Sequence, residues 1–207
     1  MTNVTAKTNS RLRERLLTLC EGAMMVVLAQ ILGYLKLWEM PWGGSICLSM
    51  FPIIFFALRR GLKPGLMAAF VFGVLQFLYD GGFALMWQAI FLDYLFAFTA
   101  LGLAGLGKGR PGGVYWGALL AGVGRFLFHY VAGATIWAVY MPEVFFGLTM
   151  TSPWFYSLLY NGFYMAIDTV LCLILFALVS NTPLKSWLYG DESVPQQKSQ
   201  QEKDPWD

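Results

Sequence analysis

Long apolar runs, separated by short polar or glycine-containing turns, fill most of this chain. A helix that crosses a bilayer needs about 20 mostly apolar residues, and six runs approach or reach that length: 16–38, 45–58, 64–80, 84–107, 113–140 and 154–180. The run at 45–58 is short and contains Pro52, which favours a tilted, kinked or partly re-entrant helix. The pattern predicts an all-α integral membrane protein with six transmembrane helices.

Basic residues occupy alternate connections between these runs. Short cytoplasmic loops retain lysine and arginine, and six crossings place all the basic connections on one side of the membrane: residues 11–15, 59–63, 108–110 and 185. The opposite connections carry one basic residue, Lys36, beside Glu39, Asp80 and Glu143. The sequence therefore predicts a multi-pass protein of the cell membrane with cytoplasmic N and C termini.

Little of the chain is left outside the predicted membrane domain, which covers residues 16–180. We expect residues 1–15 to be a short cytoplasmic segment and residues 181–207 to be a polar, disordered cytoplasmic tail, because the tail lacks apolar periodicity. The chain has no GxxxxGK[ST] phosphate loop. If it performs active transport, the energy must come from an ion gradient or from another protein.

Composition agrees with a membrane protein and excludes other classes. Hydrophobic residues make up 57% of the chain and charged residues 13%, against about 25% charged in a soluble domain. The net charge of +2, without a basic cluster, argues against a nucleic-acid partner. Cys20, Cys47 and Cys172 lie far apart in apolar surroundings, so we expect no disulfide, metal site or cofactor.

Ionisable and amide side chains inside the predicted spans are the candidate functional residues, because such groups are costly in a bilayer and tend to face a cavity. Asp93, His129 and Asn161 come from three different spans and lie at similar depths in the outer half. Arg125 and Asp168 lie deeper, and we predict that they pair below a cavity. A purely structural bridge, from Arg125 to Asp168 or to Asp93, is the alternative.

Aromatic side chains gather in the same outer region and suggest the kind of ligand. Trp137 follows His129 by eight residues, about two helical turns, and so faces the same way. Aromatic faces beside a lone carboxylate suit a flat, cationic or heteroaromatic ligand. One histidine and no HExxH or GxSxG motif argue against an intramembrane protease, and the absence of an internal repeat argues against familiar secondary transporters. A structural protein would leave the polar cluster unexplained.

Five strings in series carry a resemblance to a known family: "MPWGGSICLSMFPI" (40–53), "RRGLKPGL" (59–66), "FLDYL" (91–95), "RFLFHYVAGATIW" (125–137) and "YSLLYNG" (156–162). Together they resemble the thiamine-specific S-component of energy-coupling factor (ECF) transporters, from about residue 16 to 180. The resemblance implies a six-helix, non-enzymatic subunit that captures thiamine from outside. Its partners would be a separate transmembrane coupling protein and two ATPase subunits.

The family's thiamine-binding residues can be carried over by position. They fall on Asp93, His129, Trp137, Tyr156 and Asn161. Further residues are implied as neighbours of the ligand: Tyr94, Arg125, Gly133 and, in the first external loop, Trp42. No catalytic residue is implied.

This chain departs from the family pattern at two places. Asp93 stands where the family has a glutamate, so the shorter arm would draw the ligand closer or need a bridging water. The small-xxx-small motif of the first helix, which the family uses to contact the coupling protein, reads Ala23-x-x-x-Val27 here, and valine loosens close helix approach.

The external loop 39–45 contains Pro41, Gly43 and Gly44, and we expect it to act as a flexible lid. Another function remains open from the residues alone. The chain could be a binding subunit or a secondary transporter for a different heteroaromatic or cationic vitamin or precursor, such as thiamine phosphate or hydroxymethylpyrimidine.

Overall fold

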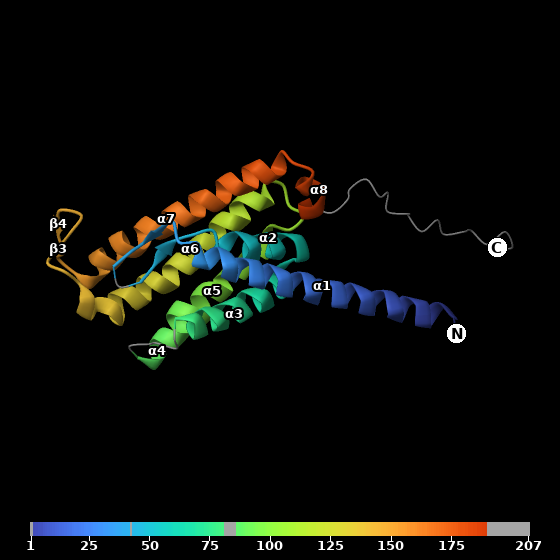
Figure 1. Cartoon of the computed structure of the whole chain (residues 1–207), viewed down its shortest axis with the longest axis horizontal. Helices are drawn as coiled ribbons and strands as arrows, with labels where there is room; N and C mark the ends of the chain where they lie inside the picture. The colour runs from blue at the N-terminus through green and yellow to red at the C-terminus, as the bar shows by residue number, and fades with distance from the viewer. Residues whose placement is uncertain (1, 42, 81–85, 190–207) are drawn as a thin grey trace, which may run out of the picture.

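Helices that run lengthwise through the molecule, inclined to one another, form its body in the computed structural model (Figure 1), which describes residues 2–41, 43–80 and 86–189. The main helices are α1 (Thr2–Tyr34), α2 (Met50–Arg60), α3 (Leu62–Tyr79), α6 (Gly113–Thr135) and α7 (Pro153–Ser180). Between α3 and α6 runs one continuous helical segment made of α4 (Trp87–Ala89), the π-helix η1 (Ile90–Phe96), α5 (Ala97–Thr99) and the 3-10 helix η2 (Ala100–Gly107). A short 3-10 helix, η3 (Trp137–Tyr140), extends α6.

Two small hairpins and a short helix complete the fold. β1 (Trp38–Glu39) pairs antiparallel with β2 (Ser45–Ile46), and β3 (Val144–Phe145) pairs antiparallel with β4 (Leu148–Thr149). The helix α8 (Leu184–Tyr189) lies at the opposite end of the molecule from the β3–β4 hairpin (Figure 1). The described part of the chain is therefore helical apart from two minimal hairpins.

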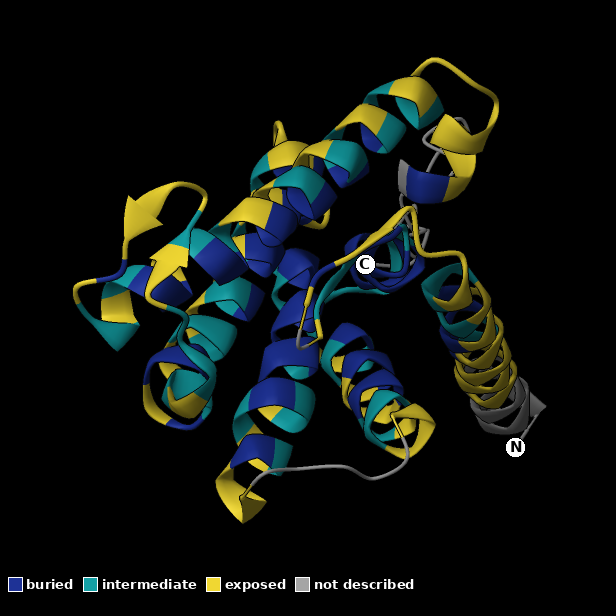
Figure 2. Ribbon diagram, turned by 60° about the vertical axis from the view of Figure 1, so that its left-hand side comes forward, coloured by how far each residue is buried: buried dark blue, intermediate teal, exposed yellow. Residues whose placement is uncertain are grey.

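Five helical segments in the described part of the chain are long and apolar enough to cross a membrane: Leu12–Tyr34, Leu62–Tyr79, Trp87–Gly107, Gly113–Thr135 and Pro153–Ser180. These match five of the six predicted spans. Their outer sides carry many exposed apolar side chains while their inner sides are buried, as Figure 2 shows. The sixth predicted span corresponds to α2, which has only 11 residues, so the count of six crossings stays a prediction.

The helix predicted over residues 45–58 begins later in the structure than the sequence pattern indicated. Ser45 and Ile46 belong to β2, and α2 begins only at Met50. The cause is a glycine turn: Gly43 and Gly44 both have positive φ, 100° and 79°, which suits a tight hairpin and not a helix. The first helix likewise ends at Tyr34 and not at 38, because residues 38–39 are used by β1.

Residues 184–189 correct a second expectation, since they form α8 and not an irregular tail. Leu188 is buried in the core, the Trp187 ring lies 5.4 Å from Phe55, and the Arg59 guanidinium lies 4.7 Å from the Trp187 ring. The remaining tail, 190–207, lies outside the described residues.

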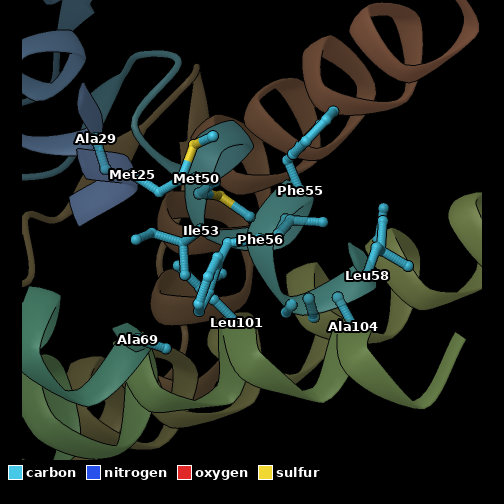
Figure 3. Packing of buried hydrophobic residues seen from close by; sticks show 14 of the residues in the cluster. Met25, Ala29, Met50, Ile53, Phe55, Phe56, Leu58, Ala69, Leu101 and Ala104 are labelled. Atoms are coloured by element: carbon cyan, nitrogen blue, oxygen red, sulfur yellow. The ribbon is translucent and has the colours of Figure 1, made fainter. Parts of the chain in front are cut away.

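The core is built around α2. Almost every side chain of this helix is buried, including Met50, Ile53, Phe55, Phe56 and Leu58. Figure 3 shows these residues packed against side chains from neighbouring elements: Met25 and Ala29 of α1, Ala69 of α3, and Leu101 and Ala104 of η2. A helix that is apolar on all sides must lie inside the bundle, so α2 serves as the central support of the fold.

An ionic cluster closes the end of the bundle where α8 lies. Glu21 of α1 accepts hydrogen bonds from Arg59 and Arg60 at the end of α2, and Arg59 also donates to the Trp187 carbonyl of α8. Lys108 lies near Gly61 at the same end. The structure thus brings two of the basic connections, 59–63 and 108–110, together at one end, and the assignment of that end to the cytoplasm stays a prediction.

Close backbone approach between α3 and η2 depends on Gly102. A Cβ at this position would lie 2.5 Å from the Leu66 backbone nitrogen, and overpacking of this kind costs about 1–3 kcal/mol. We expect Gly102→Ala to lower the melting temperature of the detergent-solubilised protein. The matched control is Gly162→Ala in α7, where the new Cβ would lie 3.8 Å from the Phe126 ring. Equal melting of the two variants would contradict this packing account.

Candidate functional site

A cavity of about 580 Å³ lies among α1, α3, η1, α6, α7 and the β1–β2 hairpin. This volume lies within the range of small-molecule sites. All of the predicted site residues that the structure describes line it: Asp93, Tyr94, Arg125, His129, Gly133, Trp137, Tyr156 and Asn161. The ninth, Trp42, lies outside the described residues. The structure therefore brings these eight predicted residues together around one cavity.

The short length of α2 makes room for this cavity. At 1.5 Å per residue, 11 residues span about half of a 30 Å hydrocarbon layer. The β1–β2 hairpin and the irregular segment after it precede α2, and Gly44, Ser45, Cys47 and Ser49 of this part line the cavity. Non-helical backbone within a membrane protein is tolerated where it borders a cavity or is buried in protein.

Asp93 is the central acidic group of the site. It belongs to the π-helix η1, its exposed fraction is 9%, and its two carboxylate oxygens have different partners. The Trp137 indole Nε1 donates to Oδ2 over 2.6 Å, and His129 Nδ1 lies 3.0 Å from Oδ1. A neutral His129 ring that donates from Nδ1 keeps Nε2 as an acceptor. Two elements, η3 and α6, thus fix the orientation of the carboxylate.

The π-helix was not predicted from the sequence. Such segments often occur at functional sites, where the extra residue per turn shifts the direction of the side chains. In η1 the shift affects Asp93 together with Tyr94, which donates a hydrogen bond of 2.9 Å to Asp80 at the rim of the cavity. Desolvation by the surrounding protein raises the pKa of the Asp80 carboxyl, and the hydrogen bond from Tyr94 and the charge of Lys36 oppose this rise.

Asn161 is held by both α6 and α7. Its Nδ2 donates to Ser157 Oγ at 3.0 Å and to the His129 carbonyl at 3.3 Å, while its Oδ1 accepts from the Tyr164 hydroxyl at 3.1 Å. Gly133 of α6 allows Ser157 and Asn161 of α7 to come this close to α6, since a Cβ at position 133 would lie 2.4 Å from Ser157 Oγ and 2.7 Å from Asn161 Nδ2. The amide is therefore oriented by a network that continues to His129.

The predicted pairing of Arg125 with Asp168 is confirmed as an ion pair of 3.8 Å between Nη1 and Oδ2. Both side chains are buried, and Asp168 is 0% exposed. The Arg125 guanidinium also lies 4.6 Å from the Phe98 ring, a cation–π distance. Arg125 lines the cavity, so it is both part of the wall and one half of the bridge.

The loop between β1 and β2 is fastened to one face of α7, which the sequence reasoning missed. The Tyr160 hydroxyl donates to the carbonyls of Pro41 and Gly43, and the Tyr164 ring packs so closely on Gly44 that a Cβ would lie 2.9 Å away. The sequence does contain a signal for this tyrosine-lined face. The tyrosines of "YSLLYNGFY" are spaced four residues apart, which places Tyr156, Tyr160 and Tyr164 on one side of a helix.

Together these features define a multi-pass, all-α membrane protein with a cavity lined by polar and aromatic side chains. A family described as thiamine transporter protein matches residues 19–186. The chain therefore belongs to the thiamine transporter protein family, and its role is transport and not catalysis.

Curated relatives and a solved structure agree with this assignment. The thiamine transporter ThiT of Bacillus subtilis is 30% identical over 82% of this chain and 93% of its own length. ThiT of Lacticaseibacillus paracasei is 28% identical over 78% of this chain and 85% of its own. A solved structure of ThiT from Listeria monocytogenes has a TM-score of 0.72, covering 85% of this chain and 98% of that chain at 24% identity, which shows the shared fold.

The contact between Tyr160 and the hairpin loop can be tested directly. Tyr160→Phe removes the hydroxyl that donates to the Pro41 and Gly43 carbonyls, so we expect faster hydrogen exchange in a peptide covering residues 36–49. The melting temperature should change little, since one hydrogen bond contributes about 1 kcal/mol. Tyr115→Phe, at an exposed position on α6, is the control. Unchanged exchange in Tyr160→Phe would contradict the role of this contact.

Proposed function

We propose that this chain is a membrane-embedded binding subunit that captures thiamine from outside the cell. The family supports this ligand, and the buried carboxylate of Asp93, held between Trp137 and His129, is the observation that carries the proposal. Thiamine joins an aminopyrimidine to a permanently cationic thiazolium. A desolvated carboxylate attracts a cation more strongly than one in water does, because the local dielectric constant is lower.

Each part of the ligand has a partner of matching chemistry. Asp93 and Asn161 offer acceptors and donors for the edge of the aminopyrimidine. Aromatic side chains on the cavity wall, among them Trp137, Tyr140 and Tyr156, offer faces for stacking and for cation–π attraction to the thiazolium. The loop around Gly43 and Gly44 acts as the lid that admits and encloses the ligand.

Transport in this proposal requires partners. The chain works with a separate ECF module, in which a transmembrane coupling protein and two ATPase subunits supply the energy. The apolar outer side of α1, with exposed Met24, Val27 and Ile31, is available for a helix of the coupling protein.

Replacement of Asp93 tests the ligand site. Asp93→Asn keeps the size of the side chain but removes its charge and one acceptor, so the dissociation constant for thiamine should rise about 10- to 100-fold. The measurement is quenching of tryptophan fluorescence during titration of the purified protein with thiamine, its phosphates and riboflavin. Glu143→Gln, at an exposed position outside the cavity lining, should bind thiamine like the wild type.

Two results would oppose this function. An unchanged affinity in Asp93→Asn would remove Asp93 from the site. Tight binding of riboflavin, or of a phosphorylated form alone, would assign the cavity to a different ligand.

The partner requirement predicts separate binding and transport steps. Proteoliposomes that contain only this chain should bind labelled thiamine without accumulating it. Addition of the coupling protein, the two ATPase subunits and ATP should produce accumulation. Uptake by the chain alone, driven by an ion gradient and abolished by an ionophore, would identify a secondary transporter instead.

A further inference from the structure

Arg125 is an unexpected residue in a cavity that is proposed to hold a cation. It lines the cavity and is 7% exposed, and its Nε and Nη1 atoms have no hydrogen-bond partner among the described residues. A guanidinium cannot lose its charge in a protein, and two like charges at short range repel each other strongly where water is excluded. Some feature of the structure must therefore reduce the effect of this charge on the ligand.

Asp168 is that feature, and it acts from behind the cavity wall. It is fully buried and does not line the cavity, yet its Oδ2 lies 3.8 Å from Arg125 Nη1 and has no hydrogen-bond partner among the described residues. Its other oxygen, Oδ1, accepts a 3.0 Å hydrogen bond from the backbone nitrogen of Cys47. One oxygen thus faces the guanidinium while the other fixes the chain that follows β2.

The charges that line the cavity show why this matters. Among the described residues they are Lys36 and Arg125, which are basic, and Glu39, Asp80 and Asp93, which are acidic. Lys36 and Glu39 form their own ion pair of 2.7 Å at the rim. With Arg125 balanced by Asp168, the charges that remain for a ligand are those of Asp93 and Asp80. The cavity then favours a cation.

From this arrangement we infer that Asp168 is a specificity-determining residue, which neutralises Arg125 and so makes the cavity select the cationic, unphosphorylated vitamin over its phosphate esters. Asp168 touches no ligand and acts through Arg125. A phosphate monoester carries a charge of about −1.5 to −2 at neutral pH, so thiamine monophosphate is net negative despite its thiazolium. This inference rests on the proposed binding of thiamine.

The discriminating variant is Asp168→Asn. It keeps an oxygen that can accept from Cys47 N–H, so the chain after β2 remains held, but it removes the charge opposite Arg125. The dissociation constant for thiamine should rise at least about tenfold, and that for thiamine monophosphate should rise much less or fall. The ratio of the two constants is the decisive quantity, because general damage to the fold would weaken both ligands together.

A second change checks that the effect passes through Arg125. Asp168→Asn combined with Arg125→Met removes both charges, so the ratio should return to within about threefold of the wild-type value. Arg125→Met alone leaves the negative charge of Asp168 without a partner. The ratio of the dissociation constants for thiamine and thiamine monophosphate should therefore change in the opposite direction from the change in Asp168→Asn. If Asp168→Asn does not fold, Arg125→Met alone still tests the inference.

The outcomes separate this inference from the proposed function. Wild-type protein that binds no thiamine overturns the proposed function itself. Wild-type binding with an unchanged ratio in Asp168→Asn, or in Arg125→Met, overturns the inference and leaves Asp168 as a structural residue. A double variant whose ratio stays at the Asp168→Asn value also overturns it.

Discussion

The satisfaction of polar backbone groups within a bilayer is the constraint on which this structure depends. Lipid offers no hydrogen bonds, so a non-helical segment at membrane depth must find its partners within the protein. The segment between β1 and α2 is non-helical and borders the cavity, and α7 supplies partners for its backbone through Tyr160 and Asp168. The short α2 leaves room for the cavity, and these contacts from α7 hold the chain that precedes α2.

The candidate site also depends on the fixed orientation of the Asp93 carboxylate. A buried carboxylate is costly unless it is hydrogen-bonded, and here the donors are Trp137 on η3 and His129 on α6. The π-helix η1 sets the position from which Asp93 reaches them. The side chain of Asp93 is thus held at both carboxylate oxygens by neighbouring elements.

Much of the architecture and most of the candidate site could be predicted from residue type and spacing. Long apolar runs gave five membrane helices within a few residues, because a continuous apolar stretch has one stable structure in lipid. The rare polar residues of these runs, Asp93, His129 and Asn161, converged on one cavity as depth and cost in the membrane implied. Arg125 and Asp168 paired for the same reason.

The features that were missed depend on tertiary structure. The strands of the hairpin at 38–46 took the ends of the two expected helices, 16–38 and 45–58, because two glycines allow a tight turn, and a sequence window that averages apolarity does not register this. The π-helix has no local signature. Tyr160 and Tyr164 were not predicted as partners of the loop, since only the folded loop shows what they contact.

One face of α7 therefore serves two purposes. Tyr164 contacts both Gly44 of the hairpin and Asn161 of the cavity wall, so the loop and the site share a side chain. The Tyr164 hydroxyl donates to Asn161 Oδ1, and its ring occupies the space that a side chain at position 44 would need. A displacement of Tyr164 would therefore disturb the amide of the cavity wall and the packing of the loop together, because both depend on the same ring.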